Sequence, residues 1–129
     1  MADLNWVTAR AKCSILIVFN EFRLEVEEDV KIINSTSRPP EYPLSSFAVR
    51  SNVVSDYFVV FQEQNANARV DFNCEVDRIT VKSGERTFSV TLTLDNAGQC
   101  KMRVNDGEPM ERWQVRRMML EDLFFQSRV

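Results

Sequence analysis

The chain has 129 residues, of which 44% are hydrophobic and 27% charged, so it is long and apolar enough to fold around a single core. Its net charge of -3 argues against a dedicated nucleic-acid-binding protein, because such proteins usually carry a clustered basic surplus. It has no histidine and only three glycines, which excludes Ser-His-Asp and Cys-His catalysis and the usual glycine-rich phosphate loops.

The three cysteines, Cys13, Cys74 and Cys100, form no C-x-x-C pair, so we expect buried, reduced thiols in a cytoplasmic protein. Without histidine they do not make up the four ligands of a closed zinc site, and we expect no metal and no cofactor. The first ten residues do not resemble a secretion signal. The longest apolar run, 15–19, is far shorter than the ~20 residues that cross a bilayer, so we expect no membrane association.

Residues 3–34 contain no glycine or proline, and their hydrophobic residues recur at spacings of three and four, which predicts an amphipathic helix. Residues 15–26 also carry a strand-like signal, but helix is the favoured interpretation. A straight helix of this length would measure ~45 Å, so it should bend, break near Asn20 or project toward a partner. The apolar stripe comprises Ile15, Phe19, Phe22, Val26, Val30 and Ile33.

The next segment, Ser35–Pro43, contains three prolines and is expected to be an extended connector inside a single domain that spans residues 1–129. Within it, Pro39–Tyr42 matches the short P-P-x-Y pattern that WW domains bind. A stiff linker whose tyrosine packs on the body of the domain is the plainer interpretation.

From residue 47 to residue 104 hydrophobic and polar residues alternate, which predicts an antiparallel meander of about five strands. The apolar phase shifts by one near Asp77, which indicates a bulge or a break there. Glycine-containing turns at Gly84 and Gly98 separate the last strands. The clearest expected strands are Phe47–Val54, Tyr57–Gln62, Arg69–Val76, 87–94 and 100–104.

A second helix should begin near Pro109 and run to the C-terminus, with an apolar stripe that includes Met110, Trp113, Leu120 and Phe124. The fold class is therefore α+β: a two-layer sandwich in which the long N-terminal helix and the C-terminal helix pack on one face of the antiparallel sheet. The hydroxyl side chains of 87–94 (TFSVTLTL) should lie on the other, open face.

The strand YFVVF, Tyr57–Phe61, is apolar on both faces and needs cover from the N-terminal segment or from a second copy of the chain. This favours a homo-oligomer with Tyr57, Val59 and Phe61 as interface candidates. The acidic residues between 21 and 29 could also attract the basic residues of the last helix, within one chain or across a dimer. Arg112 and Arg116 are therefore interface candidates too.

The absence of a catalytic constellation favours a non-catalytic protein-interaction module, such as an adaptor, a small chaperone or an inhibitor or immunity-type protein, with a partner of unknown identity. The alternative is a small-molecule binding domain with an apolar pocket between sheet and helices. The candidate pocket residues are Tyr57, Phe72, Phe88 and Trp113.

A third hypothesis is an enzyme that uses carboxylates. Asp71 and Glu75, with Asp77 beyond them, could lie along one strand face, where alternate residues are ~6.6–6.8 Å apart. A solvated sheet face predicts the same residues, so this pattern is not specific.

Overall fold

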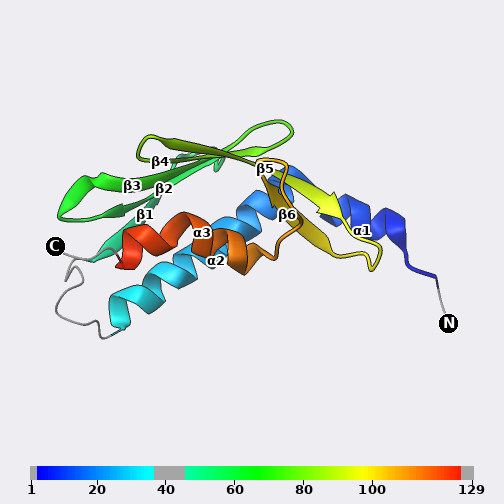
Figure 1. Ribbon diagram of the computed structural model, residues 1–129, viewed down its shortest axis with the longest axis horizontal. Helices are drawn as coiled ribbons and strands as arrows, with labels where there is room; N and C mark the ends of the chain where they lie inside the picture. Colours follow the sequence, from blue (N-terminus) through cyan, green and yellow to red (C-terminus); the bar gives the residue numbers. More distant parts are fainter. Residues whose placement is uncertain (1–2, 37–45, 126–129) are drawn as a thin grey trace.

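The computed structural model describes residues 3–36 and 46–125 and has the expected α+β class, with an antiparallel sheet and helices on one of its faces (Figure 1). The connector from residue 37 onward, including the Pro39–Tyr42 motif, lies outside the described residues. Within these residues no helix is both long and apolar enough to cross a membrane. The elements in chain order are α1 (Trp6–Lys12), α2 (Ile15–Ser35), β1 (Phe47–Ser51), β2 (Tyr57–Gln62), β3 (Asn65–Cys74), β4 (Ile79–Ser83), β5 (Arg86–Leu94), β6 (Cys100–Val104) and α3 (Arg112–Phe125).

The sheet has six strands in the order β1-β2-β3-β4-β5-β6, one more than the five expected. The additional strand arises where the hydrophobic phase shifts, because the chain turns between Cys74 and Ile79 and returns as β4. The N–H of Glu75 donates to the carbonyl of Arg78 at 2.8 Å and closes this turn. The shift is therefore a break between two paired strands.

The N-terminal helical segment breaks, which was one of the three outcomes expected of so long a helix, but the break lies at Cys13 and Ser14 and not near Asn20. Ser14 has extended dihedrals, φ -108° and ψ 148°, at the N-cap position of α2. Asn20 remains helical, and its side-chain amide donates to the carbonyl of Leu16 at 3.1 Å. Residues 15–26 are helix, and the 21 residues of α2 give a length of about 31 Å.

The core lies between α2 and the sheet, and an aromatic cluster forms its centre. Phe22 packs on Phe72 with ring centroids 5.8 Å apart, and Phe19 packs on Phe58 at 5.2 Å. Phe58 and Phe72, opposite each other on β2 and β3, stack at 4.5 Å. All six residues of α2 that are buried lie on one side of the helix, and five of them belong to the predicted stripe: Phe19, Phe22, Val26, Val30 and Ile33, with Val18 as the sixth.

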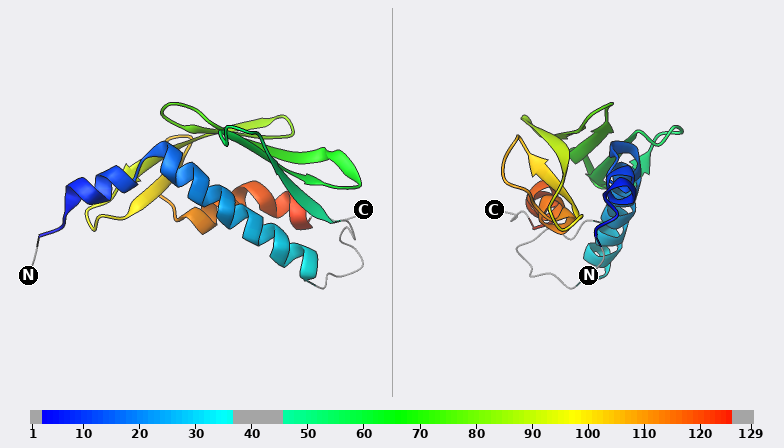
Figure 2. Two further views of the ribbon diagram at one scale, coloured as in Figure 1. Left: turned by 180° about the vertical axis from the view of Figure 1, so that it is seen from behind. Right: turned by 90° about the vertical axis from the view of Figure 1, so that its right-hand side faces the viewer.

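Helix α3 lies beside α2 against the same face of the sheet, which bends around the two helices (Figures 1 and 2). Its buried residues are Val115, Met119, Leu120 and Phe124. Trp113, expected in the buried stripe, is 53% exposed. Spacing along a helix fixes which side a residue occupies, but not whether a neighbour covers that side. At Trp113 none of the described elements does so fully.

The register between β4 and β5 shows which face of the sheet carries the hydroxyl side chains of 87–94. Phe88 pairs with Val81 and Val90 with Ile79 on the helix-covered face, and all four side chains are buried. The alternate side chains Thr87, Ser89, Thr91 and Thr93 therefore lie on the open face, as expected.

The two-faced strand β2 is covered by the chain itself. Phe58 and Val60 point toward the helices, so the pleat places Val59 and Phe61 on the open face. Val59 is nevertheless only 5% exposed. Its partner in β1, Arg50, holds its guanidinium 5.2 Å from the centroid of the Phe61 ring. A second copy of the chain is not needed to bury this strand.

The expectation of three reduced thiols is wrong for two of them. Cys13, at the end of α1, forms a disulfide with Cys100 in β6, and the two Cα atoms are 5.4 Å apart. Cys74 is a free, half-buried thiol whose pKa is raised by burial and by the nearby charge of Asp56. The cytoplasmic expectation rested partly on reduced thiols and loses that support.

Candidate functional site

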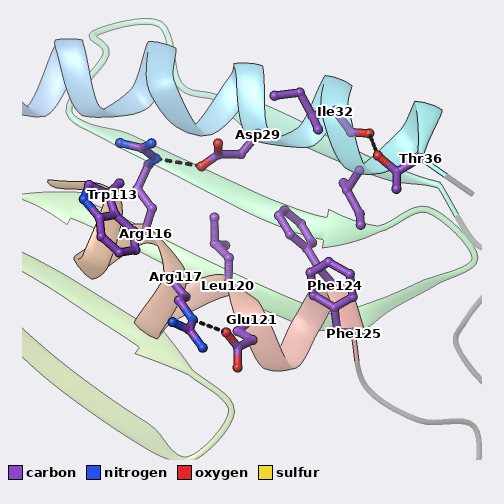
Figure 3. Close-up of a pocket in the computed structure, with 11 residues that line it drawn as sticks. Asp29, Ile32, Thr36, Trp113, Arg116, Arg117, Leu120, Glu121, Phe124 and Phe125 are labelled. Atoms are coloured by element: carbon purple, nitrogen blue, oxygen red, sulfur yellow. Dashed lines mark hydrogen bonds and ion pairs between the residues drawn. The ribbon is translucent and has the colours of Figure 1, made fainter. Parts of the chain in front are cut away.

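A groove of about 300 Å³ lies between α2 and α3 on the side of the helical layer that faces away from the sheet (Figure 3). Figure 3 shows Trp113 toward one end of this α2–α3 groove and Phe124 and Phe125 toward the other. Ile32, Trp113 and Phe125 are 54%, 53% and 44% exposed, which is unusual for such large apolar side chains. The apolar lining comprises Ile32, Ile33, Trp113, Leu120, Phe124 and Phe125.

Ion pairs between α2 and α3 hold the two walls of the groove together. Arg116 Nε donates to Asp29 at 2.7 Å and its Nη1 to Glu25 at 3.2 Å. Arg112 reaches Glu21 at 3.2 Å and Glu25 at 3.5 Å. The expected attraction between the acidic first helix and the basic last helix is therefore satisfied within one chain.

The outer wall of the groove is also neutralised locally. Arg117 pairs with Glu121 one turn along α3, and both line the groove (Figure 3). Because the charged residues around the groove already have partners, its free surface offers mainly apolar contact. Such a surface selects an apolar occupant more strongly than a charged one.

The four pocket candidates from the sequence do not come together. Phe72 is fully buried in the aromatic core, and Phe88 is 8% exposed with the guanidinium of Arg86 4.9 Å from its ring centroid. Tyr57 lies on the open face of the sheet, whereas Trp113 lines the groove on the opposite side of the molecule. Only Trp113 takes part in the α2–α3 groove.

On the open face, Tyr57 belongs to a polar cluster with Arg69 and Asp71, beside a hollow of about 440 Å³ that Lys82 also lines. The Tyr57 hydroxyl donates to Asp71 and accepts from Arg69 Nη2 at 3.0 Å, and Arg69 Nε donates to Asp71 at 3.1 Å. Partial burial acts to raise the pKa of Asp71, but the hydrogen bonds from Arg69 and Tyr57 outweigh it, so the net pKa is lowered.

The carboxylates considered for catalysis are each held by a neighbour. Glu75 accepts from the Thr80 hydroxyl at 3.0 Å. Asp77 pairs with Arg78 at 3.0 Å, and this hydrogen bond lowers the pKa of Asp77. A general acid at neutral pH needs a raised pKa, and the pKa values of Asp71 and Asp77 move in the opposite direction.

Asp71→Asn should lower the stability at pH 6 by about 1 kcal/mol, because the hydrogen bonds from Arg69 and Tyr57 favour the ionised carboxylate and partial exposure reduces their effect. The lowered pKa means that this contribution is complete above the ordinary range of an aspartate and is lost as the pH falls through the folded-state value. Urea unfolding at pH 6 and pH 2.5 should therefore show a difference from wild type only at pH 6. Asp77→Asn is the control, since this pair is exposed.

Ile32 and Phe125 line the groove but were not predicted to do so from the sequence. Both are large apolar residues just outside the buried stripes of α2 and α3. This position is the feature of the sequence that could have identified them. It becomes informative only once the two helices are known to lie side by side.

In comparisons with family models, curated proteins and solved structures, nothing matches this chain.

Proposed function

We propose that this chain is a non-catalytic protein-interaction module that forms a homodimer through the α2–α3 groove. The observation that supports this most directly is an apolar hollow beside the exposed Trp113, surrounded by charged side chains that already form ion pairs with one another. Tryptophan is among the residues that most often dominate the energetics of an interface.

A second copy of the chain is the partner that this surface fits best. In a two-fold dimer the same patch meets itself, so it needs both a hollow and a projecting group. The groove supplies the hollow of about 300 Å³, and the half-exposed Trp113 at its end supplies the projection. A strongly acidic or basic partner would find few unpaired charges there.

The helical layer is also large enough to form a dimer interface. With α2 about 31 Å and α3 about 21 Å long, and each helix ~10 Å across, the layer offers several hundred Å², of the order of the ~800 Å² per partner in a standard interface. The interface proposed here replaces the one expected at YFVVF, since Val59 is already buried within the chain.

Light scattering behind size exclusion tests this proposal with two matched tryptophans. Wild type should show a mass near twice the 15.0 kDa of one chain at high concentration. Trp113→Glu should lower it to one chain, because a carboxylate in the groove would have to be desolvated in the dimer. Trp6→Glu is the control, since Trp6 is 64% exposed on α1 and does not line the groove.

Both variants change exposed residues and should remain folded, which circular dichroism verifies. A single-chain mass for wild type at every concentration would contradict the homodimer. If that monomer nevertheless bound a hydrophobic dye through Trp113, a small apolar ligand would be the better occupant. If Trp113→Glu and Trp6→Glu both reduced the measured mass from two chains to one, the groove would not be the interface.

A further inference from the structure

Strand β5 is longer than its neighbour β4 and leaves part of one edge unpaired. Residues 86–90 of β5 pair with β4, and residues 90–94 pair with β6 on the other side. Across 3–36 and 46–125, no strand or loop forms backbone hydrogen bonds with 91–94 on the β4 side. The last four residues of β5 therefore form a short internal edge.

The hydrogen bonds of β5 show which backbone groups point toward this edge. The carbonyl of Ser89 accepts from the N–H of Asn105 at 2.7 Å, and the N–H of Asp95 donates to the carbonyl of Gln99 at 2.9 Å, so odd-numbered residues point toward β6. Backbone groups alternate in direction along a strand. The N–H and C=O groups of Leu92 and Leu94 therefore point to the unpaired side.

A cavity of about 590 Å³ lies against this edge. All four consecutive residues from Thr91 to Leu94 line it. A cavity over one face of a sheet would contact mainly the side chains of alternate residues, because successive side chains point to opposite faces. Contact with all four in succession indicates that the cavity reaches the unpaired side of the strand, where an added strand would lie.

The opposite wall is the junction between α1 and α2, and a covalent bond fixes it. Cys13, Ser14 and Ile15 line the cavity. Cys13 is bonded to Cys100, which pairs directly with Leu94 at the end of the edge. The disulfide therefore ties the junction to the strand pair that carries the edge. Figure 2 shows the α1–α2 junction running alongside β5 and β6.

The charge of the cavity comes mainly from Arg10. Its Nη1 donates to the carbonyl of Cys13 at 3.2 Å, and Arg10 forms no ion pair among the described residues. Asp77, the carboxylate in the lining, is already paired with Arg78. A carboxylate on an incoming segment would find Arg10 available as a partner.

We propose that this edge binds a short extended segment of another protein, which adds as a strand antiparallel to β5 and in line with β4, and that an acidic residue of the segment pairs with Arg10. Four residues of extended chain span ~13 Å, the length of the unpaired edge. Backbone hydrogen bonds to Leu92 and Leu94 would supply affinity, as in other cases of strand addition. This surface is separate from the α2–α3 groove.

Amide hydrogen exchange followed by NMR tests this proposal residue by residue. The probe is a pool of acetylated hexapeptides in which valine, isoleucine, tyrosine or phenylalanine alternates with threonine, each peptide carrying one glutamate. In the free protein the amides of Leu92 and Leu94 should exchange fast. With peptide they should slow by about tenfold or more, whereas Thr91 and Thr93, bonded to β6, should stay slow throughout.

Two controls separate strand addition from other binding. The same pool with alternate backbone nitrogens methylated cannot pair with an edge and should give no protection. Arg10→Glu should weaken binding of the glutamate peptides about tenfold. Lys12→Glu, on the same helix but outside the cavity lining, should not change it.

Three results would overturn the proposal. One is no protection of Leu92 and Leu94 at millimolar peptide, and another is equal binding of the methylated pool. The third is protection of these amides at high protein concentration without peptide, which would assign the edge to a second copy of the chain. None of these outcomes bears on the Trp113 experiment.

Discussion

Phe72→Ala should lower the free energy of unfolding by about 3–5 kcal/mol, the largest effect expected of a single substitution in this protein. Phe72 is fully buried, stacks on Phe58 at 4.5 Å and packs on Phe22 at 5.8 Å. Removing the ring deletes one of the two aromatic contacts described between α2 and the centre of the sheet, and it leaves a cavity between two layers that cannot close freely. Denaturant unfolding at low protein concentration measures the change.

Phe125→Ala is the matched control, because it makes the same chemical change on α3 at a residue that is 44% exposed. It should cost about 1 kcal/mol or less under the same conditions. A Phe72→Ala protein that lost no more stability than Phe125→Ala would contradict the placement of the aromatic core between α2 and the β2–β3 pair.

Cys100→Ser should lower the stability by about 2–4 kcal/mol. The disulfide closes a loop between residues 87 positions apart, so its removal greatly increases the freedom of the unfolded chain. It also releases α1, which has no buried residue and so depends on this bond for its position. Thermal unfolding should show a lower Tm, and amide exchange in α1 should become faster.

Two comparisons make this second prediction specific. Wild type in a dithiol reductant should unfold as Cys100→Ser does in its absence, since both lack the bond. Cys74→Ser removes the free thiol and should leave the response to reductant unchanged. If reductant did not alter the unfolding of wild type, the Cys13–Cys100 bond would not be contributing to the fold in solution.

The architecture followed from hydrophobic spacing wherever one element has one buried side. The period of three and four between Phe19 and Ile33 gave the buried side of α2, and the alternation in 87–94 gave both faces of β5. Each of these patterns lies within one element, and it arises because that element buries one side against the layer beside it. The α+β class and the shared position of the two helices could be predicted for the same reason.

The features that were not predicted depend on contacts between distant residues. No glycine or proline marks the helix break at Ser14, and nothing near Cys13 in the chain indicates that Cys100 will lie beside it. The exposure of Trp113 depends on how closely α2 approaches α3. The open edge of β5 exists because β4 begins at Ile79, opposite Val90, so that nothing in β4 pairs with the last four residues of β5. The hydrophobic pattern of each strand alone does not show this register.

The interface is tested most directly by the fluorescence of Trp113 in Trp6→Phe, which leaves it as the one tryptophan of the chain. If the α2–α3 groove joins two copies, raising the protein concentration should shift the emission to shorter wavelength and reduce quenching by acrylamide, in parallel with the rise in mass. If the mass rises while Trp113 stays as accessible as in the single chain, where it is 53% exposed, the groove is not the dimer interface.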